Sequence, residues 1–167
     1  MNFDESIDRT QTSCVKYNST ILINLFGSEN LTPFWVADTD FPSPPQVIDS
    51  LKKRVDFANF GYEIYPDSYQ KTVKNWFKKR HDLTLDNKAI IYSHGVMTSI
   101  ALVIQSFSGP GDGVIIQPPV YMAFRQTIKG LNRKLVSNPL LLKENRYEID
   151  FDDLEEKVTD PKNKILL

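Results

Sequence analysis

Apolar runs and turn residues alternate regularly between positions 89 and 124. The β-branched run at 89–92 is short enough for a buried strand, whereas the apolar segment 96–107 is too long for a strand and predicts a helix. Glycine and proline at 108–113 end that helix, and the run 114–116 predicts a second buried strand. A strand, a helix and a strand in this order predict a βαβ unit with parallel strands and a right-handed crossover.

The carboxyl ends of both predicted strands carry residues suited to ligand binding. Small ligands bind at this edge of parallel sheets, where helix N-termini present free N–H groups to anions. Gly95 opens the predicted helix, with the hydroxyl groups of Thr98 and Ser99 in its first turn. The second strand is followed by two prolines and Tyr121. We therefore predict a cradle for a cofactor phosphate beside an aromatic platform for a ring.

Helical spacing predicts further helices on both sides of this unit. One helix begins at Ser43 as its N-cap, with Pro44 in the first turn, and is expected to bury an apolar face. That face consists of Val47, Ile48, Leu51 and Val55. The remaining predicted helices lie near 15–26, 67–81, 124–129 and 150–158, and the remaining strands at 133–137 and 164–167, with 140–142 extending or flanking the first of these strands.

Two aspartates interrupt a run of large apolar residues between positions 31 and 42. Asp38 and Asp40 stand between Trp35 and Phe41, and prolines close the segment. One interpretation is an ordinary loop in which the aspartates cap turns. The other is a loop that lines a pocket, because aromatic residues in so polar a context indicate contact with another group. The residues alone leave both interpretations open.

Composition excludes several classes of function. A net charge of −1 gives no electrostatic basis for binding nucleic acid or an anionic membrane. No apolar run approaches the roughly 20 residues of a membrane span, and the first residues lack the basic start and apolar run of a secretory signal. The single cysteine, Cys14, permits no internal disulfide, which fits a reducing compartment. We therefore expect a cytoplasmic protein.

The chain length and the final residues bear on completeness. A chain of 167 residues can bury one core but is short for two full domains. Its last four residues, 164–167, have the pattern of a buried strand, with no turn or cap behind it. We therefore expect the sequence to be the N-terminal part of a longer protein.

Four short motifs, in order, carry a resemblance to a known family. They are Asp-Arg-x-x-Thr-x-Cys-x-Lys-Tyr-Asn at 8–18, Trp-Val-Ala-Asp-Thr-Asp-Phe at 35–41, Phe-Gly-Tyr at 60–62 and Pro-x-Tyr-x-x-Phe at 119–124. Together they resemble the MalY/PatB-type cystathionine β-lyases, carbon–sulfur lyases among the fold-type I pyridoxal 5′-phosphate (PLP) enzymes of the class I/II aminotransferase superfamily. The chain departs from that pattern at Tyr17 and Asn18, where the family has Trp and Asp, and at Thr39, where it has Met.

The resemblance implies a fold and a set of roles. The fold is α/β: an N-terminal arm and part of the small domain in residues 1–50, then the first half of the large domain in 51–167, with a mostly parallel sheet between helices. The backbone N–H groups of Gly95, Val96 and Met97 would bind the PLP phosphate, and Tyr121 would stack on the pyridine ring. Tyr62 would reach the cofactor phosphate of a partner subunit in a homodimer. Asp38 and Asp40 would lie near the substrate entrance.

The resemblance also implies that catalytic residues are missing. The Schiff-base lysine, the acid that pairs with the pyridine nitrogen and the arginine that binds the substrate carboxylate would all follow Leu167, so we expect this chain alone to be inactive. The full-length enzyme would cleave the Cβ–S bond of cystathionine or a cysteine-like amino acid. An aminotransferase, or a catalytically dead remnant that acts only by association, remains an alternative. No nucleotide-binding glycine fingerprint is present.

Overall fold

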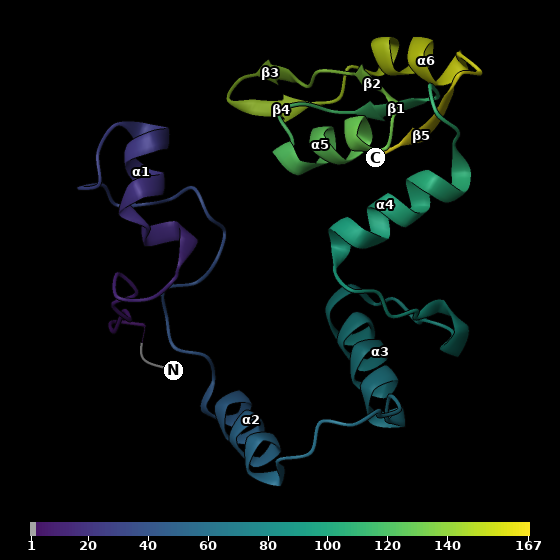
Figure 1. Cartoon of the computed structure of the whole chain (residues 1–167). Helices are drawn as coiled ribbons and strands as arrows, with labels where there is room; N and C mark the ends of the chain where they lie inside the picture. Colours follow the sequence, from purple (N-terminus) through teal and green to yellow (C-terminus); the bar gives the residue numbers. More distant parts are fainter. Residues whose placement is uncertain (1–2) are drawn as a thin grey trace. The chain divides into compact units, whose positions relative to one another are not determined.

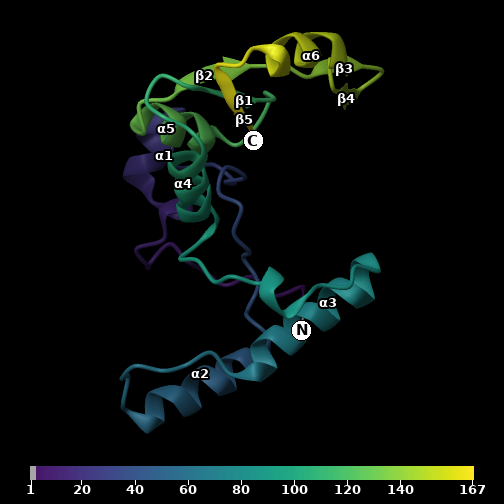
Figure 2. The ribbon, with the colours of Figure 1, turned by 90° about the vertical axis from the view of Figure 1, so that its right-hand side faces the viewer.

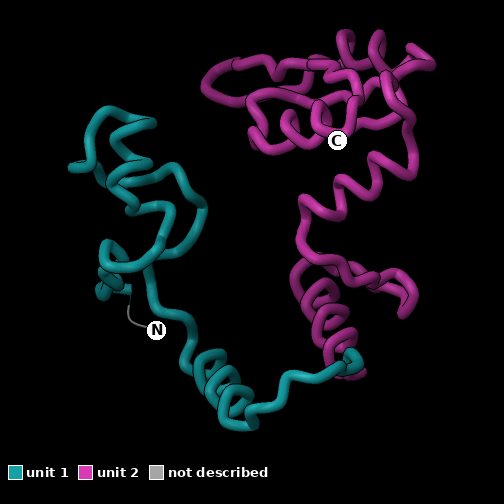
Figure 3. The backbone as a smooth tube through the Cα atoms, in the orientation of Figure 1, with its two compact units in different colours: residues 1–65 teal, residues 66–167 magenta. Residues whose placement is uncertain are grey.

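The structure is a computed structural model that describes residues 3–167, and it divides into two compact units, residues 1–65 and 66–167 (Figure 3). The first unit contains η1 (Val15–Tyr17), α1 (Ser19–Phe26) and α2 (Pro45–Phe57). The second contains α3 (Asp67–His81), η2 (Asn87–Ala89), α4 (Val96–Phe107), β1 (Gly113–Ile116), α5 (Met122–Gly130), β2 (Lys134–Ser137), β3 (Leu141–Lys143), β4 (Arg146–Glu148), α6 (Phe151–Thr159) and β5 (Asn163–Leu166) (Figure 1). The assignment of 1–50 and 51–167 to small and large domains stays a prediction.

A three-stranded parallel sheet, in the order β2-β1-β5, lies at the centre of the second unit. All four residues of β1 are buried, as expected for a central parallel strand. Figures 1 and 2 show α5 and α6 on opposite faces of this sheet. The α/β class is therefore confirmed, and β1, α5 and β2 form a parallel βαβ unit. The two other strands, β3 and β4, form a separate antiparallel hairpin.

A small apolar core fixes the helices to one face of the sheet. Ile104 of α4 and Ile128 of α5 are fully buried against Val114 and Ile116 of β1. Burial of one such side chain contributes about 1.5–3 kcal/mol to stability. This contact holds α4 and α5 in place at the sheet, and the N-caps of the two helices, Gly95 and Tyr121, are residues that the sequence marked as ligand-binding candidates.

The breaker predicted at 108–113 ends α4 as expected. Ser108 is the C-cap, and the Asp112 carboxylate accepts a hydrogen bond of 2.7 Å from the backbone N–H of Gly109. Gly111 has φ 86°, a conformation that costs residues with a Cβ about 1–2 kcal/mol. Asn132 and Arg133 also hold this turn, through the Gly111 N–H and through Ser108, and the turn leads directly into β1.

The prediction of a strand at 89–92, the first strand of the βαβ unit, is wrong. Residues 87–89 form the 3₁₀ helix η2, and 90–92 belong to no strand. Ile90 is extended, with φ −107° and ψ 111°, which is the backbone conformation of a strand residue. It pairs with no strand of the described chain, however, and Ile91 is exposed. A strand needs a neighbour for its N–H and C=O groups, and sequence periodicity does not report on that neighbour.

The predicted start and buried face of α2 are also wrong. Pro44 rather than Ser43 is the N-cap, because the helix begins one residue later, at Pro45. The four apolar residues of the predicted face are exposed by 38–64%, and α2 has no buried residue within the described chain. These four residues are Val47, Ile48, Leu51 and Val55.

Most of the other predicted elements are confirmed, with shifted ends. Helix α3 spans 67–81 as predicted, and α6 has Asp150 as its N-cap, with a hydrogen bond of 3.1 Å from the Asp153 N–H. The helix predicted near 15–26 is split, because the Asn18 side chain caps α1 at the N–H of Ile21. Among the described residues, no helix is long and apolar enough to cross a membrane.

Candidate functional site

The N-terminus of α4 has the geometry of an anion site. Gly95 is the N-cap with φ 101° and ψ 156°, a conformation essentially restricted to glycine, and no side chain caps the helix. The first N–H groups of any α-helix have no partner within the helix, and the first turn of α4 contains no acidic residue. The positive end of this twelve-residue helix is therefore uncompensated.

Two further observations at this turn indicate room for a polar ligand. A Cβ added to Gly95 would have no atom within 4 Å, so the space beside the glycine is open. The Ser93 hydroxyl oxygen is buried and has no hydrogen-bond partner among the described residues. The hydroxyls of Thr98 and Ser99 instead donate to the backbone carbonyls of His94 and Gly95, at 3.2 Å each. Thr98 and Ser99, which the sequence marked as candidates, thus already have partners in the backbone just before the helix.

Tyr121 lies in a cavity wall at the start of α5. It is the N-cap residue of that helix, is 60% exposed, and packs edge-to-face on Phe124 with ring centroids 5.7 Å apart. The cavity measures about 440 Å³, and Arg125 and Ser137 also line it. Its lining residues come from β1, α5, β2 and the loop before α5, and Gly95, Val96 and Met97 are not among them. The structure therefore does not join the start of α4 and Tyr121 in one cavity, and their roles as phosphate and ring subsites stay predictions.

Asp38 and Asp40 belong to an ion-pair cluster in the first unit. Arg9 donates to the Asp38 carboxylate at 2.6 Å, and the buried Lys16 ammonium donates to Asp40 at 2.7 Å. The Lys16 hydrogen bond lowers the pKa of Asp40, and the Arg9 hydrogen bond lowers that of Asp38. The same contacts raise the pKa values of Arg9 and Lys16, and a hydrogen bond to Asp40 raises that of Tyr17.

This cluster joins the N-terminal arm to the 35–41 loop. The indole N–H of Trp35 donates to the Lys16 carbonyl at 3.2 Å, and the Ile7 N–H donates to the Asp40 carbonyl at 3.0 Å. Sequence reasoning missed Arg9 and Lys16 as the partners of the two aspartates. The sequence did offer a signal: two basic residues lie in the N-terminal arm, and two acidic residues lie in the 35–41 loop. A role of the aspartates near substrate stays a prediction.

Tyr62 is fully exposed on a segment without helix or strand. The neighbouring turn is held by a hydrogen bond of 3.1 Å from the Gly61 N–H to the Asn59 side chain. Full exposure suits a side chain that reaches another molecule, but no contact of that kind is part of this structure, so its predicted role remains untested.

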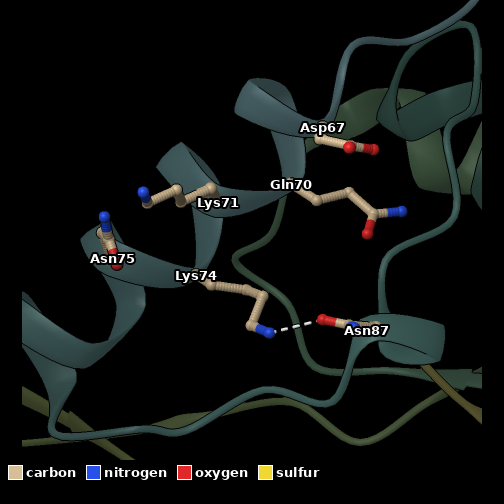
Figure 4. A pocket seen from close by; sticks show the side chains of 6 residues that line it. All are labelled: Asp67, Gln70, Lys71, Lys74, Asn75 and Asn87. Carbon is tan, nitrogen blue, oxygen red and sulfur yellow. Dashed lines mark hydrogen bonds between the residues drawn. The ribbon is translucent and has the colours of Figure 1, made fainter.

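A second pocket, of about 400 Å³, lies along the basic face of α3 (Figure 4). The Lys74 ammonium donates to the Asn87 side chain at 2.5 Å. The lining side chains are those of Asp67, Gln70, Lys71, Lys74, Asn75 and Asn87. Four of the six are exposed and two, Gln70 and Lys74, are partly buried, so this pocket is largely open to solvent. Among the described residues, no group of His, Cys, Asp and Glu could hold a metal ion.

Comparison with known proteins relates these sites to a family. Cystathionine β-lyase PatB of Bacillus subtilis is 40% identical over 161 residues, which are 96% of this chain and 41% of that protein. Cystalysin from Treponema denticola, solved with PLP, is 36% identical with a TM-score of 0.87 over 97% of this chain and 41% of that one. A PLP-bound C–S lyase from Staphylococcus hominis is 29% identical with a TM-score of 0.88 over 99% of this chain and 42% of that one.

The chain thus spans about two fifths of the length of these relatives. Residues 29–167 match the family described as aminotransferase class I and II, a range that holds α2, the parallel sheet and both candidate subsites. The chain belongs to the aminotransferase class I and II family.

Proposed function

We propose that this chain forms the N-terminal part of a PLP-dependent cystathionine β-lyase and supplies its cofactor-binding residues. The observation that carries the proposal is the N-terminus of α4, where an uncapped helix start, open space beside Gly95 and an unpartnered Ser93 hydroxyl lie within three residues. The similarity to PatB, cystalysin and a C–S lyase supports the lyase assignment over other activities of the family.

The donor set at this helix start fits a phosphate monoester. The backbone N–H groups of Gly95, Val96 and Met97 would bind the phosphate oxygens, and a dianion there would interact favourably with the helix dipole. A backbone cradle costs little reorganisation on binding, because the glycine conformation is already set by the fold. The phosphate would also give the buried Ser93 hydroxyl a hydrogen-bond partner. Without one, burial of this hydroxyl costs its hydration and returns no hydrogen bond.

Tyr121 would hold the flat ring of the cofactor. Its exposed face is available for stacking, and the edge contact with Phe124 restricts its orientation. When bound, PLP supplies an electron-withdrawing ring that stabilises negative charge at the substrate Cα. The protein contributes orientation: the phosphate subsite fixes one end of the molecule, and the aromatic ring fixes its plane.

The remaining assignments follow from the resemblance described above. The whole protein would convert cystathionine and water to homocysteine, pyruvate and ammonia, in the cytoplasm and as part of amino-acid biosynthesis. Tyr62 would contact the cofactor phosphate of the partner subunit in a homodimer, which agrees with its full exposure. Asp38 and Asp40 would shape the loop at the substrate entrance through their pairs with Arg9 and Lys16. The chain alone would have no lyase activity.

An aminotransferase is the second candidate, favoured by the family match itself. Products distinguish the two activities in the whole protein. A lyase releases pyruvate and ammonia from cystathionine without a second substrate, whereas a transaminase depends on an added keto acid. A remnant that acts only by association would co-elute with a full-length relative in size-exclusion chromatography and bind no cofactor.

Cofactor binding by the chain tests the proposal. We expect PLP, followed by absorbance and visible circular dichroism, to bind more tightly than pyridoxal, which lacks the phosphate. Tyr121→Leu should weaken PLP binding about two- to twelvefold, because an aromatic stack is worth about 0.5–1.5 kcal/mol. Tyr147→Leu is the matched control, since Tyr147 is 59% exposed in the same unit but lies on β4.

The phosphate subsite has its own variant and control. Gly95→Ala introduces a Cβ at a positive φ and should abolish the preference for PLP over pyridoxal. Gly130→Ala, at a glycine of α5 with ordinary φ and open space around it, should leave that preference unchanged. Equal affinity for PLP and pyridoxal in the unaltered chain would contradict the assignment of the α4 N-terminus.

A further inference from the structure

Two hydrogen bonds from the segment after β2 hold the loop that carries Tyr121. Residues 117–121 connect β1 to α5, and the backbone carbonyl of Pro118 accepts a hydrogen bond of 2.7 Å from the Leu140 N–H. The Gln117 side chain donates to the Asn138 side-chain oxygen at 2.8 Å. Both partners lie just after β2, the strand paired with β1. The 117–121 loop therefore has two fixed points before its chain reaches Tyr121.

Asn138 is the centre of this arrangement. It is fully buried, and its backbone N–H donates to the Ile116 carbonyl at 2.9 Å, one residue beyond the end of β2. Its side-chain N–H₂ donates to the Asp150 carbonyl at 3.1 Å and to the Asp153 carboxylate at 2.6 Å, at the start of α6. One buried amide thus connects the β1–α5 loop to a helix on the opposite face of the sheet.

The cost of burying this amide indicates a specific role. A buried amide without hydrogen bonds costs several kcal/mol, so the site depends on all of its partners. An apolar side chain at position 138 would need no hydrogen-bond partners, but it could not accept the hydrogen bond from the Gln117 side chain. The hydrogen bonds from Asn138 and Lys157 also lower the pKa of Asp153.

We propose that Asn138 is a positioning residue that holds the 117–121 loop through Gln117, and so sets the place of the Tyr121 ring. The expected effect of Asn138 on cofactor binding rests on the proposed function, whereas its role in holding the 117–121 loop does not. Asn138 touches no candidate subsite itself and acts only through the loop.

Gln117→Leu tests the proposal without removing the buried amide. We expect the Leu140 amide, which donates to Pro118, to exchange with deuterium about fivefold faster, the factor that about 1 kcal/mol of lost hydrogen bonding produces. PLP affinity should fall by a similar factor, with a changed visible circular dichroism. Asn138→Ala should act in the same direction and more strongly.

Lys157→Met is the matched control. It removes the ion pair with Asp153 on the α6 side and leaves the contact between Gln117 and Asn138 in place, so Leu140 exchange should not change. Unchanged Leu140 exchange in Gln117→Leu overturns the proposal, and so does an equal increase in Lys157→Met, which would mark a general loss of stability. If the unaltered chain binds no PLP, the proposed function fails while the exchange measurement still decides the role of Asn138.

Discussion

Replacement of Gly113 by alanine should destabilise the sheet through one identifiable contact. Gly113 opens β1 and pairs with Asn163 of β5, where the register shifts before the next pair. A Cβ built on Gly113 would lie 1.9 Å from the Asn163 side-chain oxygen and 2.9 Å from its Cγ. Real Cβ atoms do not approach other atoms this closely, so the Asn163 side chain would have to leave.

The magnitude follows from what Asn163 would lose. Its side-chain N–H₂ donates to the Lys157 carbonyl at 2.7 Å, which ties β5 to the end of α6. Loss of that hydrogen bond costs about 1 kcal/mol, and an unsatisfied, partly buried carbonyl costs about 1–3 kcal/mol more. We therefore expect Gly113→Ala to lower the free energy of unfolding by about 2–4 kcal/mol, measured by urea denaturation followed by far-ultraviolet circular dichroism.

A double-mutant cycle isolates the contact. Asn163→Ala alone loses the hydrogen bond to Lys157, but it also removes both atoms nearest the new Cβ. Gly113→Ala should therefore cost much less in the Asn163→Ala background, where Val136 at 3.1 Å is the remaining close neighbour. Strictly additive effects would refute the reasoning, as would a single Gly113→Ala variant as stable as the parent.

Two further perturbations test the core and the N-terminal cluster. Ile128→Ala empties a fully buried site and should lower the free energy of unfolding by about 2–5 kcal/mol in the same urea assay. The ion pairs that lower the pKa values of Asp38 and Asp40 stabilise the folded arm. This stabilisation is complete at pH values above the ordinary pKa of 3.8, and it is lost as the pH falls through the lower pKa values of the folded state. Trp35 fluorescence in a Trp76→Phe background should report that acid transition, and Asp40→Asn should weaken it; a transition unchanged by Asp40→Asn would contradict the cluster's role.

Local signals in the sequence predicted most of the helices and the central strands. The bounds of α3 follow from its helical spacing, and the Asp150 cap and the hydrogen bond from Gly109 to Asp112 in the 108–113 breaker each join residues three positions apart. Such interactions need no distant partner, so the sequence reports them directly. The same holds for β1, whose uninterrupted apolar run marks a strand buried on both faces.

The predictions that were wrong or incomplete concern elements and side chains whose structure depends on distant residues. Ile90 has an extended backbone and α2 has the spacing of a buried face, yet the 90–92 run joins no strand and α2 has no buried residue in the described chain. The ion pairs of Asp38 and Asp40 link residues more than twenty positions apart, which no local pattern encodes. Prediction from sequence therefore ended where an element depends on a partner elsewhere in the chain.

The candidate site divides along the same line. Gly95 was identified because it opens a predicted helix and Tyr121 because it follows a predicted strand and two prolines; in the structure each is the N-cap of a helix. Asn138 carried no such signal, since its role depends on contacts with residues 117 and 153, which only the folded sheet brings together. Because the cofactor would contact residues from several elements at once, the precision of such a site depends on these buried connections as much as on the residues that touch the ligand.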